Sequence, residues 1–381
     1  MDYRLSDELL ELQADALEVG RAAATQANVT EDTWMVGHDR SFSVELAERG
    51  WLGMTWPVEF GGGGRPPIER FIVFEALISS GAPVAASWFA DRQMGPTMLQ
   101  FGTPEQQRKY LPPILDGTSA WAIGMSEPDA GSNVAGIRTR AERDGDDFRV
   151  TGQKIWTSGA ATADFIYLIA RTDPDAPPHK GLSELIVDLH SPGVTIEPIT
   201  DIVGDRHFCE VYFDDVVVPA ENLVGELNGS FGQVMRQMEH ERGGIDRLVS
   251  NKRLFDDCRP LADTTRPLVR QELAALETGY RIGRLMVLRE VLGQAPKQFS
   301  AATKTFCTEF EQRVAAFCAS VLGPDAMLAE PGLSGRVSRN LCYATAYTIM
   351  GGTSQILRNI LGERVLGLPR PSVSEQAPRP I

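Results

Sequence analysis

Residues 231–248, FGQVMRQMEHERGGIDRL, are the stretch from which we predict both fold and function. Apolar side chains recur there every three or four residues, which is the spacing of one buried helical face. This stripe consists of Val234, Met238, Glu241, Ile245 and Leu248. A glutamate in such a stripe is most often paired with an arginine and structural. Burial also raises the pKa of a carboxyl towards the range of a general base, so Glu241 is a candidate catalytic residue.

Segments on both sides of this stretch complete the fold prediction. Helical periodicity continues in 231–254, 268–292, 301–322, 341–349 and 354–366. Before it come short β-branched or alternating runs, at 122–125, 148–150, 164–170, 182–187 and 211–218. Residues 5–24, 71–77 and 85–99 are again helical, and a further helix opens at Pro104. Because the helical and β segments are segregated along the chain, we predict an α+β protein. Its parts are an N-terminal helical domain (1–119), a central antiparallel β domain of sandwich or barrel type (120–225) and a C-terminal helical bundle (226–381).

The composition limits the class of protein. The chain has 381 residues, of which 43% are hydrophobic and 23% charged, as in an ordinary globular protein. Its net charge of -14 argues against a nucleic acid or an anionic membrane as the main partner. Neither a signal-peptide pattern nor an 18-residue uncharged apolar segment is found. We therefore expect a cytoplasmic protein without a membrane span.

Several common catalytic motifs are absent from the sequence. The five cysteines are widely spaced without a CxxC pair, and the five histidines form no HExxH. A GxSxG elbow, a Walker lysine loop and a GxGxxG are also missing. We expect neither a disulfide framework nor a metal site.

Two loops carry side chains suited to chemistry. Residues 124–133, GMSEPDAGSN, bring hydroxyl groups and glycine to the end of a predicted strand. Such a loop offers donors to an anion or a polar ring edge. Residues 154–159, KIWTSG, present a flat indole beside two hydroxyls. Each of these segments could also be an ordinary β-turn.

These loops resemble the flavin-contacting segments of the acyl-CoA dehydrogenase family, the second within GQKIWTSGA at 152–160. Residues 351–370, which begin GGTSQILRNI and end GLPR, are similar to the C-terminal helix signature of that family. The resemblance covers nearly the whole chain in the same order. It implies a C-terminal four-helix bundle and FAD held between domains and across a subunit interface.

The resemblance assigns site residues by position. Ser126 and Ser158 would lie at the flavin ring edge, Trp156 against its face and Ser132 near phosphate. Thr353 and Gln355 would lie at the adenosine end. The full cofactor-binding set is Met125, Ser126, Gly131, Ser132, Trp156, Thr157, Ser158, Thr353 and Gln355. The substrate-binding set is Ser132, Arg242 and Gly352.

The resemblance also bears on the base. Many family members carry the catalytic glutamate just before the Gly-Thr of the C-terminal segment, where this chain has Gly351. A second group places it on the first long C-terminal helix, immediately before an arginine, and Glu241-Arg242 matches that pattern. Glu241 would then remove the α proton of an acyl thioester while the β-hydride passes to FAD N5. Arg242 would point towards CoA or, equally, form a surface ion pair.

One departure from the family concerns assembly. The Arg-x-x-Phe-Gly segment that reaches a neighbouring subunit's FAD is absent, and 256–270 reads DDCRPLADTTRPLVR. Either Arg266 and Arg270 substitute in a homo-dimer or tetramer, or a paralogue completes a hetero-oligomer. We expect the homo-oligomer.

Three functions are compatible with the sequence. The first is FAD-dependent dehydrogenation of an acyl-CoA, or of a carrier-protein-bound acyl group, in fatty acid or sterol side-chain metabolism. An electron-transfer flavoprotein or a similar acceptor would then take up the electrons. The others are a flavin oxidase or monooxygenase on the same fold, and a mainly structural subunit of a hetero-oligomeric dehydrogenase. The glycines after Arg242 suggest close approach or extra volume near the base, hence a bulky acyl group.

Overall fold

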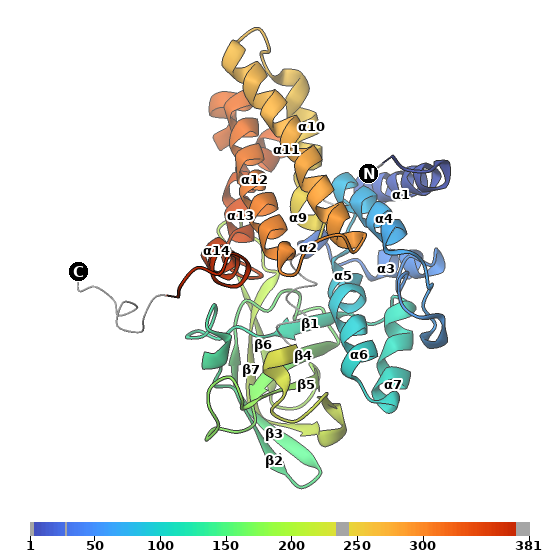
Figure 1. Ribbon diagram of the computed structural model, residues 1–381, viewed down its shortest axis with the longest axis vertical. Helices are drawn as coiled ribbons and strands as arrows, with labels where there is room; N and C mark the ends of the chain where they lie inside the picture. Colours follow the sequence, from blue (N-terminus) through green and yellow to red (C-terminus); the bar gives the residue numbers. More distant parts are fainter. Residues whose placement is uncertain (1–3, 27–28, 234–243, 371–381) are drawn as a thin grey trace, which may run out of the picture.

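The computed structural model describes residues 4–26, 29–233 and 244–370. Figure 1 shows a helical bundle at one end of the long axis, a β-sheet at the other end, and the N-terminal helices alongside both. The predicted order of helices, strands and helices, and with it the α+β class, is confirmed. Among the described helices, none combines the length and apolar character needed to cross a bilayer.

The N-terminal part is helical, as predicted. Its helices are α1 (Asp7–Gln26), α2 (Thr33–Val36), α3 (Arg40–Glu48), α4 (Pro67–Ser80), α5 (Ala85–Phe89), α6 (Gly95–Phe101) and α7 (Pro104–Leu115). A π-helical turn, Ala90–Met94, joins α5 to α6. Helix α7 begins where expected, because Thr103 and Gln106 form a reciprocal capping box.

The central part is one connected sheet. Its strands are β1 (Trp121–Gly124), β2 (Arg140–Asp144), β3 (Asp147–Lys154), β4 (Phe165–Arg171), β5 (Leu182–Asp188), β6 (Val194–Ile199), β7 (Phe208–Pro219) and β8 (Leu223–Val224). The order is β6-β7-β3-β2-β4-β5-β8, with β1 added on β4. Most pairs are antiparallel, whereas β4 pairs in parallel with β1 and, at one position, with β2. Strands β2, β6 and β8 were not predicted, since β2 is largely exposed, β6 contains Pro198 and no fully buried residue, and β8 has only two residues.

The C-terminal part contains the helices of the bundle. They are α9 (Asp246–Val249), α10 (Lys252–Cys258), α11 (Pro267–Val291), α12 (Phe299–Leu322), α13 (Leu333–Tyr347) and α14 (Ser354–Ile360). Of these, α11 and α12 are the longest. The continuous helix expected over 231–254 is wrong in its described portion, because α9 and α10 are separate. Asn251 lies between them, and its buried amide donates to the Glu311 carbonyl at 3.0 Å and to Asn340 Oδ1 at 3.2 Å. These bonds hold Asn251 outside helical geometry.

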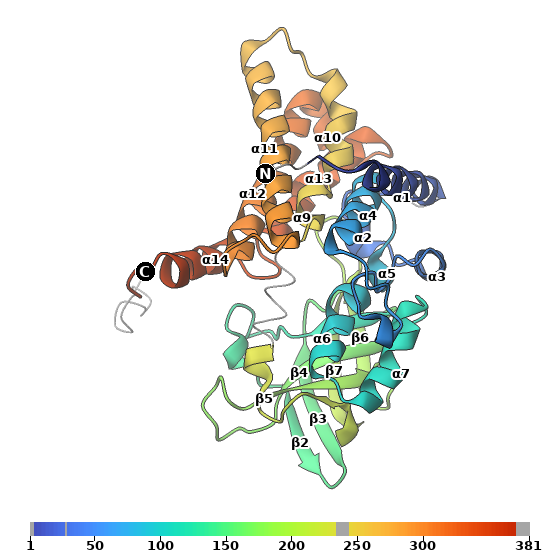
Figure 2. The same ribbon diagram turned by 45° about the vertical axis from the view of Figure 1, so that its right-hand side comes forward.

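Packing joins the three parts. One apolar cluster includes Trp34, Phe74, Phe255 and Tyr347, so the N-terminal helices and the bundle share a core. A second cluster covers one face of the sheet. A third packs α6 and α7 against β1 and β4. Figure 2 shows the sheet below the bundle, with α6 and α7 alongside the sheet.

Candidate active site

The two loops singled out in the sequence lie side by side. The loop 124–133 leaves β1, and 154–159 continues from β3. The Ile155 N–H donates to the Ser126 carbonyl at 2.9 Å, and Lys154 Nζ donates to the Met125 carbonyl at 3.1 Å. The structure thus brings together the hydroxyl groups of one loop and the indole of the other.

A buried ion pair fixes this arrangement. The Glu127 carboxylate accepts from Lys154 Nζ at 2.8 Å and from the backbone N–H groups of Arg138 and Thr139 at 2.7 and 2.8 Å. Burial acts to raise the pKa of Glu127, but Lys154 and these donors outweigh it and hold the pKa below its ordinary value. Burial lowers the pKa of Lys154 to about 8 against the opposing attraction of Glu127. Glu127 therefore stays ionised and clamps both loops.

Trp156 combines an exposed side chain with a constrained backbone, as expected of a residue that binds a ligand. It is 55% exposed, and its backbone has a left-handed φ of 61°. A bulky residue in this region costs on the order of 1–3 kcal/mol and persists only where the surroundings enforce it. Reciprocal backbone hydrogen bonds between Thr157 and Cys209, at 3.0 and 3.2 Å, supply that enforcement. The indole consequently presents a fixed flat surface.

The other predicted residues of the two loops differ in exposure. Met125, Ser126 and Ser158 are half-buried, whereas Gly131 and Ser132 are exposed. Thr157 is buried, and its Oγ1 has no hydrogen-bond partner among the described residues. Hydroxyl groups at different depths in the same two loops as an exposed indole suit a large, flat, polar-edged ligand.

A second group of predicted residues begins α14. Thr353 caps this helix, its Oγ1 accepting from the Ile356 N–H at 3.1 Å, while Gln355 is exposed. Gly352 has a left-handed φ of 94°, and its carbonyl accepts from Lys304 Nζ at 2.8 Å. Helix α14 projects from the foot of the bundle in both views (Figures 1 and 2).

The predicted base and its neighbour, Glu241 and Arg242, lie outside the described residues, as do Val234 and Met238. Two members of the predicted stripe, Ile245 and Leu248, are described, and both are buried in the core that the N-terminal helices and bundle share.

The arginines considered as substitutes for the missing segment occupy the opposite end of the bundle. Arg266 precedes α11, and Arg270 lies in its first turns, both exposed. Figure 1 shows the loop between α10 and α11 at the end of the bundle farthest from the sheet. Within one subunit these arginines therefore lie far from the strand loops.

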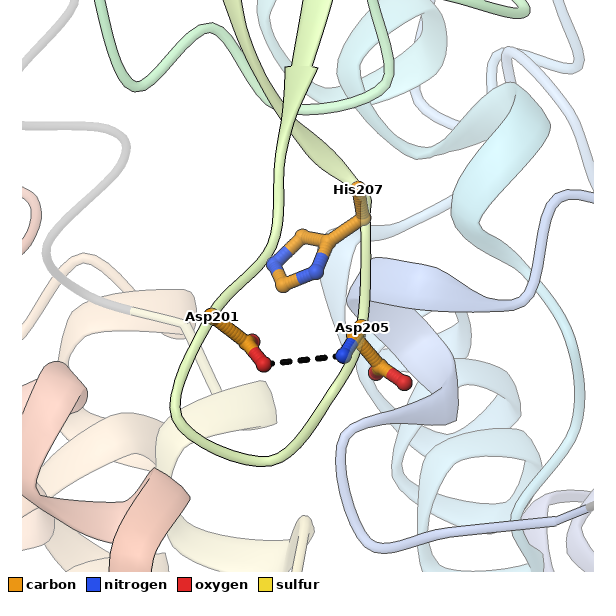
Figure 3. A group of neighbouring side chains, drawn as sticks. All are labelled: Asp201, Asp205 and His207. Carbon is orange, nitrogen blue, oxygen red and sulfur yellow. Dashed lines mark hydrogen bonds between the residues drawn. The ribbon is translucent and has the colours of Figure 1, made fainter.

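Asp201, Asp205 and His207 form a cluster with the composition of a metal site (Figure 3). Their ligand atoms all lie within 4.8 Å of one another. The Asp205 carboxylate is nevertheless paired with Arg339, and His207 bonds to the Tyr343 hydroxyl at 2.9 Å. Asp201 Oδ1 accepts from the backbone N–H groups of Val203 and Asp205 at 3.0 and 2.9 Å. Because all three side chains already have partners, we interpret the cluster as a contact between the β6–β7 loop and α13. That no metal is required stays a prediction.

Two cavities lie near these elements. One, of about 630 Å³, lies between α1 and α4 on one side and α10 and α11 on the other, and none of the predicted site residues lines it. The other, of about 280 Å³, is lined by His38, Gly159 and His207, directly behind the loop that carries Trp156. Burial lowers the pKa of both histidines to about 4, so both are neutral near pH 7.

Comparison with known families settles what this arrangement belongs to. Family models of the acyl-CoA dehydrogenase N-terminal, middle and C-terminal domains match residues 7–118, 122–216 and 231–366. The chain belongs to the acyl-CoA dehydrogenase family. It is an oxidoreductase that acts on acyl-CoA, and the resemblance found in the sequence is confirmed.

Relatives of this dehydrogenase are similar over most of their length. Acyl-CoA dehydrogenase IpdE1 of Mycobacterium tuberculosis is 36% identical over 341 residues, covering 87% of this chain and 88% of the relative. A structure described as "Tcur3481-Tcur3483 steroid ACAD" superimposes with a TM-score of 0.89 at 33% identity, covering 97% of this chain and 100% of the other. The ChsE4-ChsE5 complex from Mycobacterium tuberculosis gives 0.85 at 30% identity, covering 98% and 100%.

Members of the family are flavoproteins, typically with FAD. The strand loops of this dehydrogenase fit such a group, because they combine an enforced, exposed indole with half-buried hydroxyls. The sequence analysis assigned no role to Glu127 or to Lys304, whose Nζ donates to the Gly352 carbonyl. The available signal for Lys304 is a charged residue on the buried helical face of Ala301, Thr308 and Ala315, a face that also contains Glu311.

Proposed function

We propose that this dehydrogenase holds FAD against the loops after β1 and β3 and oxidises the α,β bond of an acyl-CoA thioester. The observation that carries the proposal is Trp156, whose indole is exposed and whose backbone is held in a left-handed conformation, on a loop hydrogen-bonded to the one that carries Ser126. Bound FAD would supply the acceptor for the hydride that leaves the β carbon.

The residues of this chain have separate tasks in the proposal. Ser126 and Ser158 donate to the polar edge of the flavin ring, where negative charge builds up during the reaction. Ser132 and Gly131 bind phosphate from the exposed end of their loop. Thr353 and Gln355 contact the adenosine end, where the N-terminus of α14 also favours an anion.

Glu241 is proposed as the base that takes up the α proton. Gly351, at the other position used in the family, has no carboxylate. The burial of Ile245 and Leu248 supports the apolar stripe from which Glu241 was chosen. Arg242 and Gly352 are proposed to contact the substrate, with Arg242 directed towards the CoA phosphates.

The acyl group is proposed to be bulky and derived from a steroid. The support is the name of the 33% identical "steroid ACAD". An electron-transfer flavoprotein or similar acceptor would remove the electrons after each turnover.

For the assembly, we now propose pairing with a related second chain. Two similar structures are named as pairs, Tcur3481-Tcur3483 and ChsE4-ChsE5. In this chain, Arg266 and Arg270 lie at the start of α11, and this end of α11 is the one farthest from the sheet, so they could reach FAD only from a neighbouring subunit. A chain that purifies alone as a yellow dimer or tetramer would restore the homo-oligomer that the sequence suggested. If the chain takes up flavin only when it is co-expressed with a neighbouring homologue, the hetero-oligomer is supported.

The function is tested by anaerobic mixing of the purified flavoprotein with CoA esters of short, long, branched and steroid-derived acids. We expect the steroid-derived ester to bleach the flavin fastest and to form the 2-enoyl product. A flavin that no ester bleaches would contradict the function, and rapid reoxidation by oxygen during turnover would favour an oxidase.

A further inference from the structure

The π-helical turn between α5 and α6 carries two charged side chains that bind different helices. Asp91 pairs with Arg70 of α4 at 2.6 Å. Arg92 pairs with Asp246 of α9 at 3.0 Å, and the two side chains are only 7% and 0% exposed. A buried ion pair adds little net stability because desolvation offsets the attraction, while loss of one partner is costly. Such a pair fixes geometry more effectively than it stabilises the fold.

The Arg92–Asp246 pair is packed directly on the backbone of Gly244. A Cβ added at Gly244 would overlap with the Asp246 carboxylate and the Arg92 guanidinium. A larger residue at this position would therefore displace the ion pair, which gives one of the two glycines after Arg242 a steric reason. Gly244 is three residues beyond Glu241 in sequence.

A second buried anchor holds the chain before Glu241. Glu184 of β5 is fully buried and accepts from Gln233 Nε2 at 2.6 Å and from Ser230 Oγ at 3.2 Å. The Tyr167 hydroxyl also donates to this carboxylate. Gln233 is the last described residue before the segment that contains Glu241, and Gly244 is the first after it.

We propose that Arg92 and Glu184 are positioning residues for the proposed base: Glu184 fixes Ser230 and Gln233, and Arg92 fixes Asp246 beside Gly244, on either side of Glu241 in the sequence. The inference rests on the proposed function of Glu241. Arg92 belongs to the N-terminal part and Glu184 to the sheet, so the described residues before and after the Glu241 segment are tied to different parts of the molecule. Proton transfer needs a base within hydrogen-bond reach, and a misplacement of about 1 Å can cost about 10²-fold in rate.

The test compares variants by anaerobic flavin reduction in the FAD-loaded enzyme. Arg92→Met should slow the limiting rate by about 10- to 100-fold, with FAD content and the half-saturating substrate concentration close to wild type. Gly244→Ala should have the same effect without removing a charge, and Arg92→Lys should recover part of the rate. Arg70→Met is the matched control, since it removes the ion pair of the same turn that does not reach α9. It should leave the rate near wild type.

Wild-type rates in both Arg92→Met and Gly244→Ala would overturn the inference while leaving the proposed function intact. If no acyl-CoA reduces even the wild-type flavin, the proposed function fails instead. In that case, the rate of amide hydrogen exchange in residues 229–249 tests the anchoring independently of activity. Faster exchange in Arg92→Met but not in Arg70→Met supports it, and unchanged exchange in Arg92→Met rejects it.

Discussion

Glu127 illustrates how one carboxylate can determine the shape of two loops. Glu127→Ala would leave a buried ammonium group and two backbone donors without their acceptor. We expect it to cost about 3–5 kcal/mol of unfolding free energy and to reduce flavin retention. Thermal unfolding and the flavin absorbance of the purified variant measure both effects. Asp129→Ala is the control, because Asp129 is in the same loop with a side chain 78% exposed. Equal behaviour of the two variants would contradict the clamp.

Glu184 should make stability depend on pH. Burial raises its pKa from 4.5 to about 7, although Tyr167, Gln233 and Ser230 donate to the carboxylate and act in the opposite direction. The folded protein therefore holds a proton that the unfolded chain releases between these values. This contribution to stability is complete below about pH 4.5 and is lost as the pH rises through 7. Glu184→Gln, which cannot titrate, should lose less stability than wild type between pH 5 and 8 in urea unfolding. Parallel losses in the two proteins would exclude Glu184 as the source.

At the scale of elements, α14 depends on its cap. Thr353→Ala removes the acceptor of the Ile356 N–H and should cost about 0.5–2 kcal/mol of helix stability. If α14 contacts FAD as proposed, cofactor affinity should fall as well, and Thr353→Ser should retain both properties. Titration of the apoprotein with FAD provides the measurement. Unchanged affinity in Thr353→Ala would separate α14 from the cofactor.

The elements also show which signals the sequence contains. Helices α11 and α12 were predicted within two residues, because long amphipathic stripes report a buried face. Strand β2 was missed because only Ala141 of its five residues is buried, so it shows no alternation. The break at Asn251 depends on partners in α12 and α13 that are distant in sequence. Local patterns therefore predicted the main elements but neither the exposed strands nor the interruption.

At the scale of the whole molecule, Arg339 connects three parts. Its guanidinium on α13 pairs with Asp32 before α2 at 2.5 Å and with Asp205 in the β6–β7 loop. Arg339→Met would leave the buried Asp32 carboxylate unpaired, so we expect a loss of about 3–5 kcal/mol in chemical unfolding. Arg108→Met removes an ion pair whose side chains are 70% and 73% exposed and should cost at most about 1 kcal/mol. A similar loss in both variants would reject Arg339 as the connection.

The candidate site could be predicted only in part, because some of its contacts join residues that are distant in sequence. The loops 124–133 and 154–159 carry recognisable side chains, so their role followed from the resemblance and their proximity is now observed. Glu127 and Arg92 act through partners 27 and 154 residues away in sequence. A single sequence does not contain such pairings, because they arise only when the three parts pack together.

The most direct test of the account is anaerobic flavin reduction by the preferred acyl-CoA in Glu241→Gln. The amide keeps the shape of the side chain and removes its basicity, so the variant should bind FAD as wild type does. Its flavin reduction should be slower by at least about 10²- to 10⁴-fold. Bleaching at the wild-type rate would show that Glu241 is not the base.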